Sequence, residues 1–251
     1  MGKKMYYLII PISILFCLFT SCMSKSVEPN SALFTSQEMQ AEPNAVVRET
    51  LHDTSHSQSE IRIAYPVFVN NHMEKINQDV FSFVSEIANH IYGSDYENVH
   101  LQIDYEIKLF NLKYLSIIFY GIGESQSAYP NNIFLTRNYD LEQNTNVILS
   151  DLYCLNMDFA QKIYASVEAQ KETAIIEVFK ADYATINAFY QALLSCDTNT
   201  SSFQSYLTTE GIGVCIPIRH VGGDYITIEL NNREVSEWTV TSEKSRGVSV
   251  Y

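Results

Sequence analysis

The chain is poor in basic residues. Among its 251 residues it has 16 Lys and Arg against 29 Asp and Glu, which gives a formal net charge of −13 at pH 7. Proteins that bind nucleic acid neutralise its phosphates with Lys and Arg, so this charge balance excludes nucleic acid as a partner and disfavours anionic lipid headgroups. The same surface attracts a cationic partner, although acidity of this degree also serves solubility alone.

The chain also lacks the spaced motifs of metal, redox and nucleophilic chemistry. Its six His residues are scattered without an H-E-x-x-H pair, and no two cysteines form a C-x-x-C motif. The glycines in the segment 121–125 match neither the G-x-S-x-G motif nor a phosphate-binding loop. We therefore expect no cofactor, no metal site and no catalytic residue, which predicts a protein that is not an enzyme.

No apolar run is long enough to span a bilayer. The longest covers residues 5–19 and is broken only by Pro11 and Ser13, whereas a membrane-spanning helix needs roughly 20 apolar residues. Lys3 and Lys4 precede it. A short apolar run after a cationic start is typical of a cleaved signal peptide rather than of a permanent anchor.

The end of this run, Leu18-Phe-Thr-Ser-Cys22, resembles a bacterial lipobox. Thr20 and Ser21 fit its small positions, and Phe19 stands where Leu is usual. The resemblance implies that residues 1–21 are a lipoprotein signal peptide and that Cys22 becomes the lipid-carrying N-terminus, with acyl chains such as palmitate. The protein would then be anchored to the extracytoplasmic face of a bacterial cell membrane. An ordinary secretory signal with a chance cysteine is the alternative.

Residues 22–60 have the composition of a flexible tether. They are rich in Ser, Glu, Gln, Asn, Thr and Pro and contain few large apolar side chains. Such a segment cannot bury enough apolar surface to offset the entropy of ordering. His52 and His56 have the i, i+4 spacing of helical metal ligands, but a flexible tether would not preorganise them.

Residues 61–232 carry the patterns of an α+β domain. Strict alternation over 99–109 predicts a half-buried strand, and apolar residues spaced by three or four over 71–92 predict a helix. Further strands are expected at 61–69, 114–120, 133–139, 146–149, 203–207, 212–218 and 225–230, with helices from Ser150 to about residue 193. We predict a single domain in which helices pack on one face of an antiparallel sheet, followed by a C-terminal tail over residues 233–251.

Several sequence pieces in this domain resemble the extracytoplasmic domain shared by RsiV-type anti-sigma factors and PdaC-type peptidoglycan deacetylases. The pieces that carry the resemblance are Tyr65-Pro-Val-Phe, Leu115-Ser-Ile-Ile-Phe-Tyr120, Ser127-Ala-Tyr-Pro-Asn131, Asn138-Tyr-Asp-Leu141, Leu149-Ser-Asp-Leu152, Tyr206-Leu-Thr-Thr-Glu-Gly211 and His220-Val-Gly-Gly-Asp-Tyr-Ile-Thr-Ile228. Together they cover about residues 61–230. The resemblance implies a lipid-anchored, non-enzymatic binding module for peptidoglycan or for a cationic wall-degrading protein such as lysozyme.

Four residues are the candidate ligand-binding positions, namely Tyr129, Pro130, Asn131 and His220. Tyr129 stands where the family commonly has His, which departs from the pattern. The segment before the apolar run is too short for sigma binding, and we expect no separate deacetylase domain. Two alternatives stay open: a wall-glycan hydrolase or deacetylase that uses exposed Asp104, Glu106 or His220, and a structural envelope-assembly lipoprotein.

Overall fold

The computed structural model describes residues 46–125, 129–198 and 201–240. All of them belong to one compact unit, residues 38–251. The predicted signal peptide 1–21, the lipidated Cys22, residues 22–45 of the predicted tether and residues 241–251 of the predicted tail lie outside the described residues.

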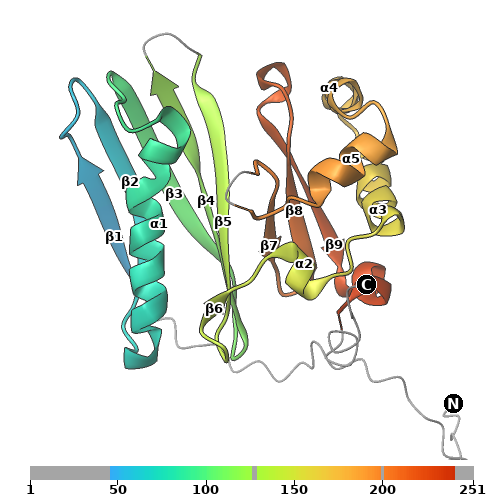
Figure 1. Cartoon of the computed structure of the whole chain (residues 1–251), viewed down its shortest axis with the longest axis horizontal. Coiled ribbons are helices and arrows are strands. Elements are labelled where there is room, and N and C mark those ends of the chain that lie inside the picture. Colours follow the sequence, from blue (N-terminus) through green and yellow to red (C-terminus); the bar gives the residue numbers. More distant parts are fainter. Residues whose placement is uncertain (1–45, 126–128, 199–200, 241–251) are drawn as a thin grey trace, which may run out of the picture. The chain divides into compact units, whose positions relative to one another are not determined.

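The first sheet has six strands in the order of the chain (Figure 1). All neighbours pair antiparallel except the second and third strands, which run parallel. The parallel pair is possible because a helix crosses over between these two strands. The strands are β1 Val46–Asp53, β2 Glu60–Phe68, β3 Val99–Phe110, β4 Tyr114–Ser125, β5 Asn131–Asp140 and β6 Thr145–Asn146.

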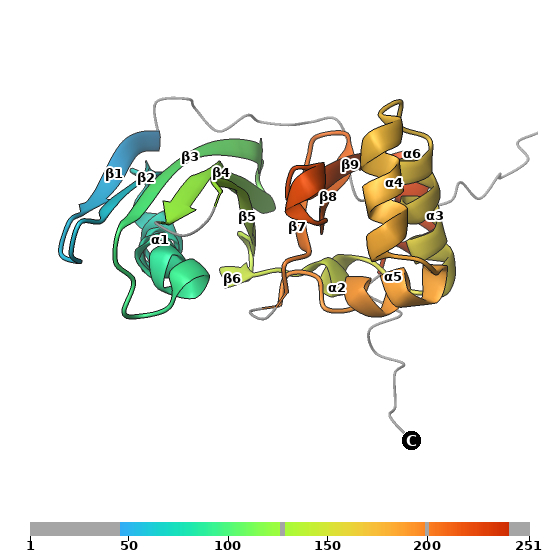
Figure 2. The same cartoon turned by 90° about the horizontal axis from the view of Figure 1, so that it is seen from above.

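The crossover helix α1, Glu74–Tyr92, covers one face of this sheet. A 3-10 turn, Asn71–Met73, precedes it and is capped by the Asn70 side chain, and Gly93 ends it with a φ of +84°. The sheet curves around the helix (Figure 2). The shared core includes Val80 and Val84 of α1, whose side chains are completely buried.

A second, three-stranded antiparallel sheet and most of the remaining helices form the other half of the unit. The sheet lies between the first sheet and helices α3 to α5 (Figures 1 and 2), and it shares a separate core with them. Its strands are β7 Gln204–Leu207, β8 Gly211–Pro217 and β9 Tyr225–Asn231; the helices are α2 Leu149–Leu152, α3 Met157–Glu168, α4 Thr173–Asp182, α5 Ile186–Leu193 and α6 Asn232–Val235, with 3-10 turns at His220–Gly222 and Ser236–Trp238.

The fold class is therefore α+β, as the sequence predicts, but the strands divide into two sheets. The closing strands had been expected to complete a single sheet. Instead, β7 packs face to face against β4 and β5. The contact includes buried hydrogen bonds: Asn138 of β5 donates to the Ser205 carbonyl (2.9 Å), and Ser116 of β4 donates to Asn138 Oδ1 (2.7 Å) and accepts from Leu207 N (2.9 Å).

Two predicted boundaries were wrong. Residues 46–53 of the expected tether form β1, which pairs with β2 along its whole length. Backbone pairing stabilises this edge strand although most of its side chains are exposed. Its polar composition therefore gave no sign of a strand in the sequence. Residues 233–240 of the expected tail are also folded, because Val235 is buried and Val240 N donates to the Leu152 carbonyl at 2.8 Å.

Pro66 stands inside a strand although proline has no backbone N–H to donate. It lies in β2, which has a neighbour on each side, but the pairing with β3 covers only residues 60–63. Pro66 therefore sits beyond the last β3 partner, where its missing N–H removes no ladder bond on that side.

The three cysteines of the domain are free thiols. Cys196 and Cys215 are buried, and burial raises the pKa of both thiols; Cys154 is exposed. The two buried cysteines thus behave as small apolar side chains.

Candidate functional site

Two of the four predicted binding residues come together at one end of the two sheets. Tyr129 lies in the β4–β5 connection and His220 in the β8–β9 turn, and these connections lie at the same end of the structure (Figure 1). Their ring centroids are 6.1 Å apart with an interplanar angle of 19°. Tyr129 is 81% exposed and the His220 side chain 48%, so both rings are accessible to a ligand.

Asp224 holds His220 in place. One Asp224 oxygen lies 2.8 Å from His220 Nδ1, and the other accepts from the Asn132 backbone N–H at 2.7 Å. Asn132 in turn donates its side-chain amide to the Gly223 carbonyl at 3.3 Å. These bonds tie the two connections together, and the use of Nδ1 leaves Nε2 as the ring nitrogen available to a ligand.

The turn geometry explains how Asp224 reaches both partners. Gly223 has a φ of +99° and Asp224 a φ of +74°, a left-handed conformation that Gly and Asp adopt at lower cost than most residues. We call Tyr129, His220, Asp224 and Asn132 the platform. Pro130 and Asn131 are exposed between Tyr129 and Asn132, and Asn131 begins β5 opposite Gly123.

Aromatic side chains continue the platform along the junction of the two sheets. Tyr225, which follows Asp224, packs against Phe134 of β5 with ring centroids 5.1 Å apart, and Phe134 lies 5.7 Å from Tyr206 of β7. Tyr120, which is 40% exposed, is the β4 partner of Phe134. Directly paired residues project to the same face of a sheet, so Tyr120 extends this aromatic surface.

An open hollow adjoins the surface on the same face of the first sheet. Ile122, the β4 partner of Asn132, is 53% exposed and lines it. The hollow has a volume of about 450 Å³, and its other side chains are polar or charged, among them Arg62, His100, Gln102 and Glu124. An extended polar ligand on the platform would therefore find further hydrogen-bonding groups in the hollow.

The two β3 carboxylates that the sequence left open as an acid–base pair each lie beside a cation. Asp104 bonds Arg48 at 2.6 Å, and the Arg48 guanidinium lowers the pKa of this carboxyl group. Glu106 lies 3.4 Å from Lys108, which is also 3.7 Å from Glu229 of β9.

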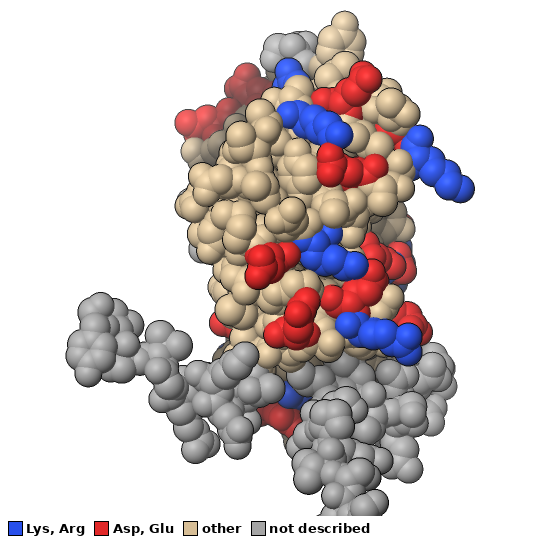
Figure 3. Space-filling model, turned by 90° about the vertical axis from the view of Figure 1, so that its right-hand side faces the viewer, with Lys and Arg blue, Asp and Glu red and all other residues tan. Residues whose placement is uncertain are grey.

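The acidic net charge is not concentrated on the face that carries α3 and α4. Figure 3 shows Lys and Arg beside Asp and Glu there. Two of the ion pairs that produce this pattern are Lys180–Glu168 at 2.7 Å and Lys162–Glu234 at 2.8 Å. A face of alternating sign gives little steering to a cationic partner.

Sequence reasoning missed Asp224 and Asn132, the two residues that fix His220. The Gly222-Gly-Asp224 turn was the only signal for Asp224, and Asn132 bonds Asp224 through its backbone N–H, which any residue type offers. Within the described part of the chain, no group of three His, Cys, Asp or Glu side chains is placed to hold a metal ion. The described helices are all too short or too polar to cross a membrane.

Comparison with known proteins gives likeness at the level of the fold only. No family model matches the chain, and no curated protein matches it. A DUF3298 family protein from Pseudomonas aeruginosa PAO1 is 10% identical with a TM-score of 0.49, and the match covers 78% of this chain and 94% of that one. A DUF3298 member from Bacteroides fragilis NCTC 9343 is 14% identical with a TM-score of 0.45, covering 79% and 94%. Likeness of this degree does not indicate a shared function.

Proposed function

We propose that the protein is a lipid-anchored, extracytoplasmic binding module of the RsiV/PdaC-like type, and that its ligand is a cell-wall polymer. The observation that carries the proposal is the platform, where exposed Tyr129 lies beside His220, whose ring is fixed by Asp224. Aromatic rings offer an apolar surface with a polar edge. Such a surface suits sugar rings, which present C–H groups on their faces and hydroxyl groups around their edges.

The surroundings of the platform favour a chain-like ligand over a compact one. The aromatic surface leads from the platform toward Tyr206, and the hollow on the first sheet supplies polar groups of both signs. A glycan strand could contact both regions at once. Several weak contacts along one polymer add up to useful affinity.

Binding to wall material tests this function. The mature chain, residues 22–251 without lipid, is incubated with purified peptidoglycan and the bound fraction is measured after sedimentation. We expect Tyr129→Ala to weaken binding at least tenfold, equivalent to about 1.4 kcal/mol. The control is Phe81→Ala, an aromatic residue of α1 that is 48% exposed and does not belong to the platform.

The same assay distinguishes a protein ligand from a glycan. Salt-sensitive binding to lysozyme without binding to peptidoglycan would identify the ligand as a cationic protein rather than a wall polymer. Charge attraction weakens with ionic strength, so salt sensitivity is its signature. Absence of both interactions at low salt would overturn the proposed function.

Anchoring is tested separately through Cys22. Two or three acyl chains hold a protein firmly to a membrane, whereas one gives only marginal binding. Cys22→Ala should therefore release the protein from membranes or leave its precursor uncleaved. Unchanged mature protein in the membrane fraction would rule out lipidation at this residue.

A hydrolase or deacetylase acting on wall glycan is the second candidate, and the His220–Asp224 pair is the observation that favours it. A carboxylate bonded to Nδ1 orients an imidazole so that Nε2 can accept a proton. Muropeptide products that are formed by the natural chain but not by His220→Ala or Asp224→Asn would support catalysis. Binding without products would support the binding module.

A further inference from the structure

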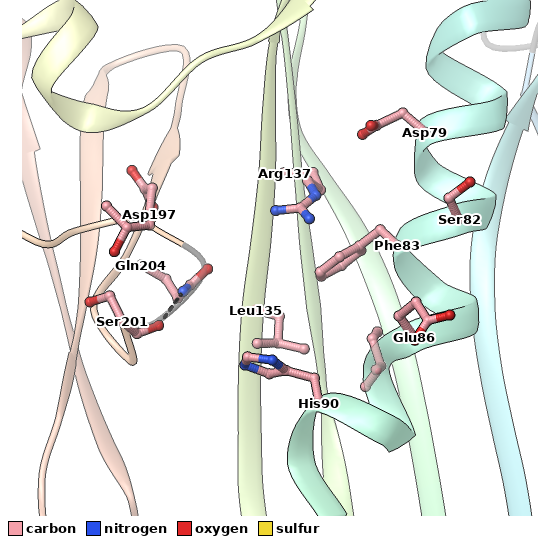
Figure 4. Close-up of a pocket in the computed structure, with 12 residues that line it drawn as sticks. Asp79, Ser82, Phe83, Glu86, His90, Leu135, Arg137, Asp197, Ser201 and Gln204 are labelled. Atoms are coloured by element: carbon pink, nitrogen blue, oxygen red, sulfur yellow. Dashed lines mark hydrogen bonds between the residues drawn. The ribbon is translucent and has the colours of Figure 1, made fainter. Parts of the chain in front are cut away.

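A cavity of about 320 Å³ lies beside β5. Helix α1 and strand β5 line it on one side, and residues 197–198, 201 and 204 line it on the other (Figure 4). Leu135 and Arg137 alternate along β5 with Phe134 and Thr136, and alternate residues of a strand project to opposite faces. The volume falls within the range of small-molecule sites.

Arg137 has no counterion among the described residues that line this cavity. Its guanidinium carbon lies 3.8 Å from the centroid of the Phe83 ring. Its Nε is buried without a hydrogen-bond partner, and the described residues place no carboxylate within ion-pairing distance of it. Arg137 is half-buried, with Nε buried and the rest of its guanidinium open to the cavity. A guanidinium in this position suits a planar, bidentate anion such as a carboxylate.

Asp197, on the far wall, does not meet this need. Its carboxylate accepts from Leu149 N at 2.9 Å, from Ser205 N at 2.6 Å and from the Ser205 hydroxyl. Through these bonds Asp197 stabilises the far wall of the cavity. Asp197 is thus occupied by backbone and hydroxyl donors and leaves Arg137 free to pair with an anion of a ligand.

Two further carboxylates on α1 keep one oxygen each free of hydrogen bonds to the described residues. Asp79 accepts from the Tyr139 hydroxyl at 2.6 Å through Oδ2, and Glu86 accepts from Asn89 at 3.1 Å through Oε2. Both residues line the cavity together with His90. Figure 4 shows Asp79 and Arg137 on facing walls. The cavity thus offers a site for an anion and, apart from it, acceptors for a cation.

We propose that this cavity binds a small zwitterion, a free amino acid or short peptide, with its carboxylate on Arg137 and its ammonium group on Asp79. The guanidinium fork bonds both carboxylate oxygens, and Asp79 Oδ1 accepts from the ammonium group. The site takes the termini of the ligand, so it favours unblocked ends.

Binding of three related dipeptides tests the proposal. The probes are L-alanyl-L-alanine, its C-terminal amide and its N-acetyl derivative, titrated into the full mature chain and followed by calorimetry and by protein NMR. We expect saturable binding of the free dipeptide and at least tenfold weaker binding of each blocked form. Arg137→Met should weaken the free dipeptide at least tenfold and bind the amide no more weakly than the natural chain does. The matched control is Arg62→Met, a 57% exposed side chain of β2.

A second variant covers the case in which Arg137→Met fails to fold. Asp79→Asn should weaken the free dipeptide but leave the N-acetyl form unchanged, because that form has no ammonium group. The proposal is overturned if no probe binds, if the blocked and free forms bind alike, or if Arg137→Met folds and binds normally. Tyr129→Ala should leave dipeptide binding unchanged, so failure here is distinct from failure of wall-polymer binding.

Discussion

Asp197 shows how much one buried side chain contributes to this structure. It has a φ of +63°, and its carboxylate joins the start of α2 to strand β7 through the bonds from Leu149 and Ser205. Burial raises the pKa of this carboxyl group. The short-range signal for such a role is weak, because the partners lie far away in the sequence or use backbone groups.

We expect Asp197→Ala to lower the free energy of unfolding by about 3 kcal/mol. The substitution leaves buried donors without an acceptor and places Ala at a positive φ. Urea denaturation measures the effect. Asp95→Ala, at an exposed turn position, is the control and should change stability by less than about 0.5 kcal/mol. Equal effects of the two substitutions would contradict the role of Asp197.

Tyr153 gives a prediction for alkaline pH. Burial raises its pKa from 10.0 to about 12. A raised folded-state pKa means that the stability due to the neutral phenol is fully present below pH 10 and is lost as the pH rises toward 12. Tyr153→Phe keeps the stacking on Phe159, whose ring centroid is 5.8 Å away.

The variant should therefore match the natural protein at pH 7 and exceed its stability at higher pH, by up to roughly 3 kcal/mol. The free energy of unfolding in urea, measured at pH 7 and at pH 11, checks this. A stability difference that stays constant from pH 7 to pH 11 would show that Tyr153 ionises as readily when folded as when unfolded.

Only some of the individual site residues could be predicted from the sequence. Tyr129 and His220 were selected by resemblance, and the structure brings them together. Arg137 could not have been found, because its importance depends on which face of β5 it occupies and on the approach of Phe83 from a distant helix. No short sequence motif indicates a contact between residues so far apart in the chain.

Among the elements, those with a clear period were predicted well. The alternation over 99–109 matches β3, and the spacing of apolar residues over 71–92 matches the turn at Asn71–Met73 followed by α1. Strand β1 was missed because it is polar on both faces for most of its length. The expected strand at 146–149 shares only Asn146 with β6, which is Thr145–Asn146, and Leu149 begins α2 instead.

The close pairing of β3 with β4 depends on Gly121. A Cβ atom there would lie 2.0 Å from the Gln102 carbonyl oxygen and 2.8 Å from Ile103 Cα, both backbone atoms of β3. We expect Gly121→Ala to force the strands apart and to cost about 3 kcal/mol of stability.

Gly93→Ala is the control for this substitution, because a Cβ there meets nothing within 4 Å although φ is +84°. It should cost about 1 kcal/mol from backbone strain alone. Thermal unfolding of both variants measures the difference. If Gly121→Ala costs no more stability than Gly93→Ala, β3 and β4 can separate enough to accept a Cβ atom at this position.

At the scale of the whole unit, two apolar cores meet at a junction that combines buried hydrogen bonds with aromatic contacts. Asn138 is 3% exposed and bonds both sheets. The single tryptophan, Trp238, packs on Phe159 in the core of the second sheet, with ring centroids 5.5 Å apart. Its fluorescence therefore reports on one half of the unit. The split into two sheets was not predictable from strand patterns, which fix the faces of strands but not their partners.

We expect Asn138→Leu to cost about 3 kcal/mol by leaving the Ser205 carbonyl and the Ser116 hydroxyl without their partner. Because these bonds join the halves, the fluorescence and far-UV circular dichroism transitions should separate in the variant and coincide in the natural chain. Asn187→Leu, at an exposed position of α5, should leave them coincident. Coincident transitions in Asn138→Leu would mean that other contacts couple the two cores.

The parallel pairing of β2 with β3 has a consequence for the order of folding. It joins Glu60 to His100, and this contact cannot form before α1 has crossed the sheet. The pairs β3–β4, β4–β5, β7–β8 and β8–β9 join strands that are adjacent in the chain, so their loop-closure cost is low. The β2 side of β3 is thus an open edge early in folding. Until the β1–β2 hairpin docks there, a second unfolded chain competes for the same edge, and yield on refolding should fall as the protein concentration rises.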